Sequence, residues 1–83
     1  MKIYVKIMPK AGVLDPQGKA IENSLKQLGF TNVQEARQGK IVELNLDIKN
    51  EEDALALTRE MSERLLTNMV IEDFEISIIK DDL

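Results

Sequence analysis

Three stretches of this chain alternate apolar and polar residues, which is the pattern of a β-strand with one buried face. They cover residues 2–8, 42–48 and 74–80. In the two intervals between them, apolar residues recur at helical spacing instead. A chain whose strand and helix patterns alternate in this way must build a sheet and cover it with helices. The order of the patterns therefore restricts the fold to a mixed class of sheet and helix.

The first helix is predicted to begin at Asp15 and Pro16. An aspartate at the N-cap accepts hydrogen bonds from free backbone N–H groups, and proline fits the first helical position, where its missing N–H costs nothing. Gly29 is expected to end the helix. The predicted buried stripe consists of Ile21, Leu25 and Leu28.

The second helix is predicted to begin at Asn50, with three acidic residues at 51–53 in its first turn. Acids at this position interact favourably with the helix dipole. Consecutive helical residues point in different directions, so these carboxylates do not form a metal site. The predicted buried stripe consists of Ala54, Leu57, Met61 and Leu65.

Residues 30–38 are predicted to form a weaker strand, because Val33 is their only strong β-former. A polar strand belongs at a sheet edge, and Gly39 suits a hairpin turn after it. The whole chain then reads β-α-β-β-α-β, which is the ferredoxin-like pattern of the α+β class. We expect a four-stranded antiparallel sheet, in the spatial order fourth, first, third, second, with both helices on one face.

The opposite face of this sheet combines polar residues with a few apolar ones. The apolar members are Tyr4, Met8, Ile41 and Ile79. Two interpretations stay open. The patch is either a contact surface for another subunit or a set of scattered apolar residues on an ordinary wet surface. The 83 residues suffice for one domain, residues 1–83, and such a small core favours subunit contact.

Composition excludes several classes of function. The chain has no Cys and no His, so it cannot assemble a Ser-His or Cys-His nucleophile. Its 15 acidic against 11 basic residues give a net charge of −4, which disfavours nucleic acid as a partner. No apolar run approaches the roughly 20 residues of a membrane span. Carboxylate and lysine chemistry remains possible, although the acidic residues are scattered over polar faces and helix ends. We expect a cytoplasmic protein and no cofactor-binding or metal-binding site on this chain.

Residues 12–20 superficially resemble a phosphate-binding loop. Five residues separate the two glycines where such a loop needs four, and Ala20 stands where a hydroxyl should hold the metal. Asp15 also adds negative charge where an anion would bind. Gly18 lies in the first turn of the predicted helix, where it either lets another backbone approach or tolerates the tight loop before it.

Several blocks resemble the PurS family of small subunits of phosphoribosylformylglycinamidine synthase. The first block is residues 9–18, which read Pro-Lys-Ala-Gly-Val-Leu-Asp-Pro-Gln-Gly. Residues 28–30, Val33, Arg37 and residues 39–40 continue the likeness. Residues 65–72 resemble the closing segment of the family. Met69 departs from the usual proline, which loosens the turn after the second helix. Phe74 departs from the common tyrosine, which removes a hydroxyl group.

The resemblance implies a role inside a larger enzyme. The complex would use ATP, Mg and glutamine to convert formylglycinamide ribonucleotide to formylglycinamidine ribonucleotide in purine biosynthesis. A large ligase subunit and a glutaminase subunit would carry the chemistry. The small subunit would associate with itself, as a dimer or a tetramer, and bridge the other two. No catalytic residue is implied on this chain, and its lack of Cys and His agrees with that.

Matching positions give six candidates for shape or contact. They are Lys10, Asp15, Pro16, Gly18, Asn68 and Glu72. Helix capping alone would explain Asp15 and Pro16, and Asn68 would serve as a residue at a helix end. Solvation would explain Lys10 and Glu72. The sequence does not decide between these roles.

An alternative function comes from the predicted fold. Ferredoxin-like domains also serve as small-molecule sensors, as in regulatory modules that bind amino acids. A sensor would show a ligand-dependent rise in melting temperature, whereas an assembly subunit would not. An acylphosphatase-like enzyme fits poorly, because residues 9–18 offer only Lys10 as a cation.

Overall fold

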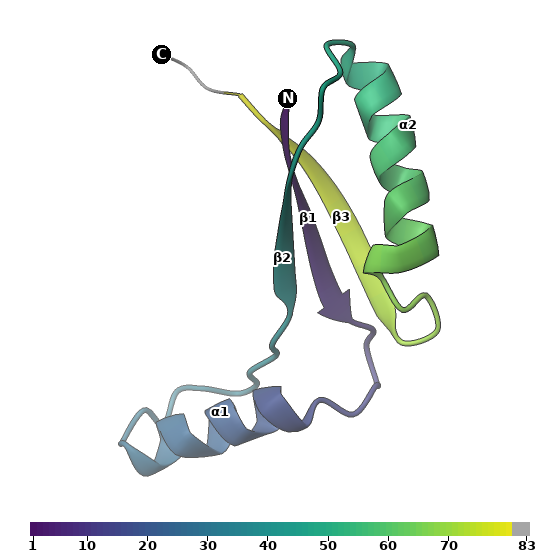
Figure 1. Cartoon of the computed structure of the whole chain (residues 1–83). Helices are drawn as coiled ribbons and strands as arrows, with labels where there is room; N and C mark the ends of the chain where they lie inside the picture. Colours follow the sequence, from purple (N-terminus) through teal and green to yellow (C-terminus); the bar gives the residue numbers. More distant parts are fainter. Residues whose placement is uncertain (81–83) are drawn as a thin grey trace.

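The computed structural model describes residues 1–80, which form three antiparallel strands and two long helices (Figure 1). The strands are β1 (Lys2–Pro9), β2 (Lys40–Asn45) and β3 (Glu72–Ile79), in the spatial order β2-β1-β3. The helices are α1 (Pro16–Gln27) and α2 (Glu51–Met61). The predicted α+β class is therefore confirmed, and so is the central place of the first strand.

Strict alternation in β1 produces the core. Val5 pairs with Val42 of β2 on one side and with Ile76 of β3 on the other, so one face of the sheet is apolar across all three strands. Ile3, Val5 and Ile7 are at most 1% exposed. On the opposite face, the ammonium group of Lys2 lies 3.9 Å from the Glu43 carboxylate, and that of Lys6 lies 3.6 Å from the Glu75 carboxylate. The alternation thus divides the sheet into a dry face and a charged face.

Helix α2 covers the dry face with short side chains. Its fully buried positions are Ala54, Thr58 and the following Ser62, which recur every four residues. The predicted stripe was right at Ala54 but wrong at Leu57 and Leu65, which are exposed. Small residues let the helix approach the sheet closely, so the larger leucines remain at its flanks. The Ser62 hydroxyl donates to the Thr58 carbonyl at 2.8 Å, which satisfies one of the buried polar groups.

The end of α2 widens into a π-helical turn, η1 (Ser62–Leu66). This turn closes with a hydrogen bond from the Thr67 N–H to the Ser62 carbonyl, at 2.9 Å. A π-turn shifts the helical register by about one residue. Leu66 therefore packs against the core, while Leu65 is left exposed.

The predicted strand over residues 30–38 is wrong. These residues form a turn and an irregular segment, so the sheet has three strands over the part of the chain that the structure describes. The segment is polar, and it is held by one hydrogen bond to the Asp15 side chain and one from its own Arg37 side chain to β1, rather than by β2. Gln38 donates its N–H to the Asp15 carboxylate, and Arg37 donates to the Pro9 carbonyl. Gly39 consequently precedes β2 without forming a hairpin.

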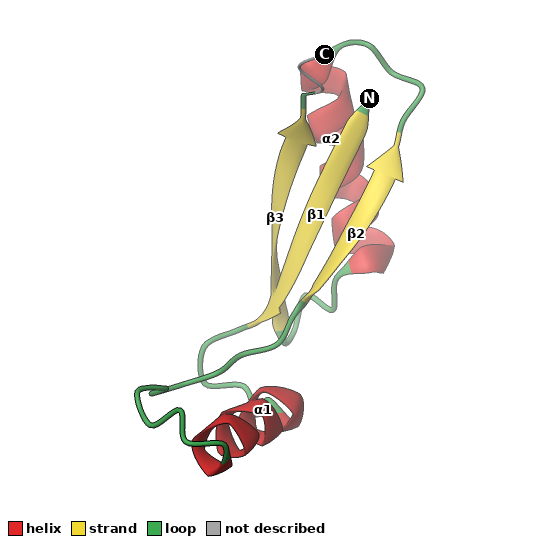
Figure 2. Cartoon of the chain, turned by 90° about the vertical axis from the view of Figure 1, so that its left-hand side faces the viewer, coloured by secondary structure: helices red, strands yellow, loops and turns green. Residues whose placement is uncertain are grey.

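The predicted position of α1 over the sheet is also wrong. Helix α1 lies beyond the ends of the strands, while α2 alone crosses the dry face (Figures 1 and 2). Ile21 is 41% exposed and Leu28 is 74% exposed, although both belong to the predicted buried stripe. We call residues 10–39 the arm, and the three strands with α2 and η1 the sheet body. The position of α1 is the largest difference between the predicted fold and the observed one.

The boundaries of the elements are close to the predicted ones. Asp15 caps α1 by accepting from the Gly18 N–H, and Asn50 caps α2 by accepting from the Asp53 N–H. Gly29 ends α1 with a backbone φ of +100°, which favours glycine. The acidic tail at residues 81–83, predicted to be frayed, lies outside the described residues. Among the helices of residues 1–80, none has the length and apolar character needed to cross a membrane.

Candidate functional site

The first block of the resemblance forms the junction between the arm and the sheet body. Asp15 is its centre, because the two carboxylate oxygens accept from different segments. One oxygen takes the Gly18 N–H and the other takes the Gln38 N–H, both at 2.9 Å. These backbone hydrogen bonds hold the pKa of the Asp15 carboxyl below its usual range. The residue thus caps α1 and also fastens it to the returning segment.

Two glycines let the junction close tightly. A Cβ atom at Gly18 would collide with the Ala36 carbonyl oxygen and with the Asp15 carboxylate. A Cβ atom at Gly39 would collide with the Ile7 carbonyl and the Met8 side chain. Of the two roles considered for Gly18, the structure therefore supports close approach of another backbone. Both glycines bring residues 36–39 against elements that are far away in the sequence.

Lys10 and Arg37 both make contacts at one end of the sheet, where Pro9 of β1 pairs with Glu72 of β3. The Arg37 guanidinium donates to the Pro9 carbonyl at the end of β1. The Lys10 N–H donates to the Ile71 carbonyl at 2.8 Å, and its ammonium group lies 3.6 Å from Asp73. Lys10 is therefore partly a structural residue, and its side chain is only half-solvated. Arg37 is exposed, but it fixes the backbone rather than simply facing water.

The second block forms the turn between η1 and β3. The Asn68 N–H donates to the Glu72 carboxylate at 2.7 Å, and the Val70 N–H donates to the Asn68 side-chain oxygen at 3.1 Å. The N–H groups of Ile71 and Glu72 both donate to the Asn68 carbonyl. Asn68 and Glu72 thus give the turn its shape. Met69 and Val70 remain exposed at its tip.

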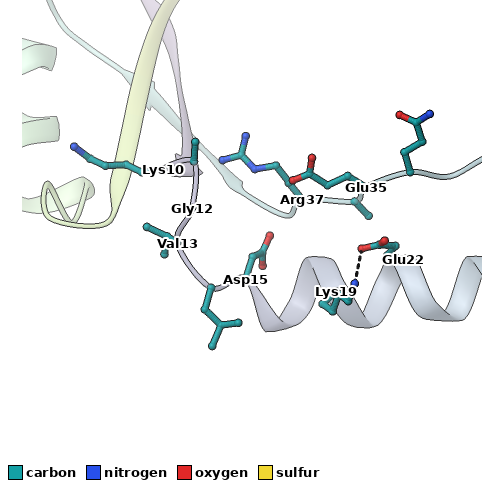
Figure 3. Close-up of a pocket in the computed structure, with 12 residues that line it drawn as sticks. Lys10, Gly12, Val13, Asp15, Lys19, Glu22, Glu35 and Arg37 are labelled. Atoms are coloured by element: carbon teal, nitrogen blue, oxygen red, sulfur yellow. Dashed lines mark ion pairs between the residues drawn. The ribbon is translucent and has the colours of Figure 1, made fainter.

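A cavity of about 630 Å³ opens inside the arm, between the loop before α1, the first turns of α1 and residues 34–37 (Figure 3). Its charged lining is balanced between three cations and three acids. The six residues are Lys10, Lys19, Arg37, Asp15, Glu22 and Glu35. A lining without net charge gives no preference for an anionic or a cationic ligand.

The buried carboxylate of this cavity is already neutralised by its own helix. Glu22 is 6% exposed, and its oxygens lie 3.1 Å from the Lys26 ammonium and 3.5 Å from that of Lys19. The hydrogen bond from Lys26 and the charge of Lys19 hold the pKa of Glu22 below its usual range. Glu22 and Asp15 both remain ionised near neutral pH. Neither carboxyl can therefore act as a proton donor.

The structure brings the two sequence blocks together at Lys10. Asp15, Pro16 and Gly18 lie in the arm, and Asn68 and Glu72 lie in the turn. A second cavity, of about 180 Å³, is lined by Gln17 and Gln38 from the arm and by Glu72 from the turn. Sequence reasoning missed Gln38 and Glu22. The only signal for Glu22 was its spacing from Lys19 and Lys26, which predicts ion pairs on one helix face, and nothing in the sequence pointed to Gln38.

Within residues 1–80 no group of three His, Cys, Asp or Glu residues is arranged to hold a metal ion. The polar side chains of the junction and the turn are instead occupied by backbone groups of the chain itself. Internal hydrogen bonds therefore determine the shape of both regions. The same regions carry the residues that the resemblance singled out.

Comparison with known proteins gives one consistent answer. The PurS family, described as phosphoribosylformylglycinamidine (FGAM) synthase, matches residues 2–80. A PurS subunit of phosphoribosylformylglycinamidine synthase from Bacillus subtilis is 41% identical over 78 residues, which cover 94% of this chain and 89% of the relative. The corresponding subunit from Methanocaldococcus jannaschii is 40% identical over 79 residues, covering 95% of each chain.

Solved structures agree. The crystal structure of PurS from M. jannaschii superposes with a TM-score of 0.85 at 40% identity, covering 98% of both chains. A chain in the structure of PurLQS from Thermotoga maritima superposes with a TM-score of 0.86 at 29% identity, covering 94% of this chain and 95% of that one. Likeness over nearly the whole length includes the arm as well as the sheet body. The chain belongs to the PurS family of phosphoribosylformylglycinamidine synthase subunits.

Proposed function

We propose that this chain is a non-catalytic assembly subunit that bridges the glutaminase and ligase subunits of the synthase. The observation that carries the proposal is the family match over residues 2–80. The T. maritima relative of known structure is part of a PurLQS assembly. The residues of this chain include no Cys and no His, which makes them unsuited to the glutaminase chemistry.

ATP, Mg and glutamine would bind to the partner subunits, and this chain would bind no cofactor. The complex would convert formylglycinamide ribonucleotide to formylglycinamidine ribonucleotide in the cytoplasm. Two features of the described residues support this division of labour: the pKa values of Asp15 and Glu22 in the larger cavity are lowered, and the charges of its lining balance. A lining without net positive charge does not favour a phosphorylated ligand, and its ion pairs and hydrogen bonds instead hold the arm in shape.

We further propose that the subunit associates with itself. Among residues 1–80, the fully buried apolar core consists of four residues, Ile3, Val5, Ile7 and Ala54. Small domains with little core and no disulfide often gain stability through association. A mass measurement in solution would distinguish a dimer from a tetramer.

Co-purification tests the bridging role most directly. The tagged chain would be expressed in its native host and recovered with ATP-Mg and glutamine present, and its companions would be identified by mass spectrometry. We expect the ligase and glutaminase subunits. Recovery of the chain alone would contradict the proposal. A metabolite screen by thermal shift would then test the small-molecule sensor that the sequence left open.

Lys10→Glu should weaken assembly with the two partners and leave the isolated domain folded. The residue lies where the arm, β1 and the turn meet, so reversing its charge changes the surface that both sequence blocks share. Gel filtration of the mixed subunits measures the effect. Lys6→Glu is the matched control, because Lys6 forms an ion pair of the same 3.6 Å length on the charged face of the sheet. Assembly of Lys10→Glu as complete as that of the unchanged chain would exclude a contact role for Lys10.

A further inference from the structure

Two adjacent leucines at the end of α2 lie in opposite environments. Leu65 is 83% exposed, whereas Leu66 packs against the core cluster. In an uninterrupted α-helix Leu65 would follow Thr58 by seven residues, which is the spacing that returns to the same face. Thr58 is fully buried, so the α-helical pattern would put Leu65 in the core. The extra residue held by the π-helical turn η1 brings Leu66 to that face instead.

Either register closes the helix with one backbone hydrogen bond. In η1 the Thr67 N–H donates to the Ser62 carbonyl at 2.9 Å. In an α-helix the same carbonyl would accept from the Leu66 N–H, four residues further on. The Ser62 hydroxyl donates back to the Thr58 carbonyl at 2.8 Å. That bond lies before the turn, so a change of register leaves it intact.

The π register carries a cost at Thr67. This residue is 6% exposed, and its hydroxyl group has no hydrogen-bond partner among residues 1–80. A buried hydroxyl without a partner destabilises a fold, because the group has lost its hydrogen bonds to water. The Thr58 hydroxyl also lacks a partner within these residues, but it precedes the turn and does not depend on the register. In the α register, Thr67 would turn away from the buried face and Leu65 would take the place of Leu66.

The turn that follows η1 favours the π register and offsets this cost. The Asn68 N–H donates to the Glu72 carboxylate at 2.7 Å. The Ile71 carbonyl accepts from the Lys10 N–H at 2.8 Å, which fixes the start of β3. A one-residue change of register therefore has to be absorbed by residues 66–71. Figure 1 shows that this stretch is the short loop between the end of α2 and β3.

We propose that the end of α2 is a two-state element in which Leu65 and Leu66 alternate in one core position as the helix changes between the π and the α register. The π register keeps Leu65 at the surface. The α register withdraws Leu65 into the core, gives the Thr67 hydroxyl access to water and displaces the turn that carries Asn68 and Glu72. Register shifts of this kind take microseconds to milliseconds. A partner that binds the turn in one arrangement selects that register, so contact at the second sequence block is coupled to the helix.

A double-mutant cycle on the two leucines tests the exchange in the full chain. In a fixed π register, Leu65→Ala removes an exposed side chain and Leu66→Ala removes a packed one, so their losses in urea midpoint should add. In the two-state element each leucine replaces the other, and each single substitution has a small effect. We expect the midpoint loss of the double variant to be at least twice the sum of the single losses. Additive losses, measured at one protein concentration, would overturn the proposal.

Leu57→Ala replaces Leu65→Ala in the control cycle. Leu57 is also an exposed leucine of α2, at 37%, but it lies too far before the turn to occupy the place of Leu66. The losses of Leu57→Ala and Leu66→Ala should therefore add. Non-additivity of the same size in this pair would indicate a general weakening of α2, and it would overturn the proposal as well.

Nuclear magnetic resonance gives a second, independent measurement. In the unchanged chain, relaxation dispersion should detect exchange at the amides of residues 62–72 and none in β1. Leu65→Ala should abolish the exchange, because the side chain that fills the core in the α register is missing. Flat profiles over residues 62–72 in the unchanged chain would overturn the proposal. Should the double variant fail to fold, this measurement decides alone.

Discussion

The sheet body and the arm are stabilised by different interactions. In the sheet body, apolar side chains from three strands and α2 exclude water, together with the buried side chains of Thr58, Ser62 and Thr67. In the arm, α1 buries no large apolar residue, and its position depends on hydrogen bonds from Asp15 and on two close-fitting glycines. Apolar packing tolerates volume-conserving changes, whereas a hydrogen-bonded junction depends on individual atoms.

This difference separates two roles within one small chain. The sheet body provides most of the free energy of folding, because burial of apolar surface is the dominant favourable contribution. The arm determines where the first sequence block lies, because it extends beyond the ends of the strands. It also leaves the apolar face of α1 exposed. Mutations in the two regions should therefore produce different kinds of damage, and three predictions make the comparison sharper.

The largest effect is expected in the core. Ile7→Ala should lower the free energy of unfolding by about 2–5 kcal/mol, because it removes buried methylene groups and leaves a cavity. Urea denaturation at one fixed protein concentration measures it. Leu28→Ala, at the exposed C-cap of α1, should change the stability of the isolated monomer by no more than about 0.5 kcal/mol. A cost at Leu28 as large as that at Ile7 would mean that the arm carries core packing after all.

An intermediate effect is expected at the tightest point of the arm. Gly18→Ala should destabilise the arm by about 1–3 kcal/mol, although alanine favours helices, because its Cβ atom would strike the Ala36 carbonyl. Hydrogen exchange should become faster at the amides of residues 36–38 and remain slow in β1. Gln17→Ala, one residue earlier and exposed, is the control. Unchanged or slower exchange in Gly18→Ala would show that the backbones do not need to meet so closely.

The smallest effect is expected from the carboxylate of the junction. The pKa of Asp15 is lowered in the folded chain, so its contribution is present above the unfolded value of about 3.9 and is lost as the pH falls through the folded value. Asp15→Asn cannot accept both backbone N–H groups equally well. The gap in urea midpoint between wild type and Asp15→Asn should be largest near neutral pH and shrink below about pH 4. A gap of the same size at pH 3 would exclude the ionised carboxylate as its cause, and Asp47→Asn controls for the lost charge.

Local patterns made part of the fold predictable. Alternation placed β1, β2 and β3 nearly at their observed bounds, and Asp15, Asn50 and Gly29 marked helix ends through their own backbone chemistry. Each of these signals depends on residues that are close together in the sequence. Such signals remain readable because the tertiary structure does not need to change them.

The failures have tertiary causes. The buried face of α2 follows Ala54, Thr58 and Ser62 rather than the leucines, because the helix approaches the sheet closely. The strand expected over residues 30–38 is replaced by a segment that Asp15 and Arg37 hold from a distance in sequence. Gln38 belongs to the junction through its backbone N–H, which every residue except proline has. The residue type at position 38 therefore could not have predicted this contact.

The sequence by itself determined the two helices and three of the four predicted strands, and the central place of β1. It also determined the absence of thiol and imidazole chemistry and the family resemblance at residues 9–18 and 65–72. Periodicity, side-chain chemistry and motif spacing are all local properties. Only the tertiary structure decided where α1 lies. A helix with an apolar stripe is equally amphipathic over its own sheet or beyond it. The choice depends on the glycine contacts and hydrogen bonds that join residues 15–18 to residues 36–39.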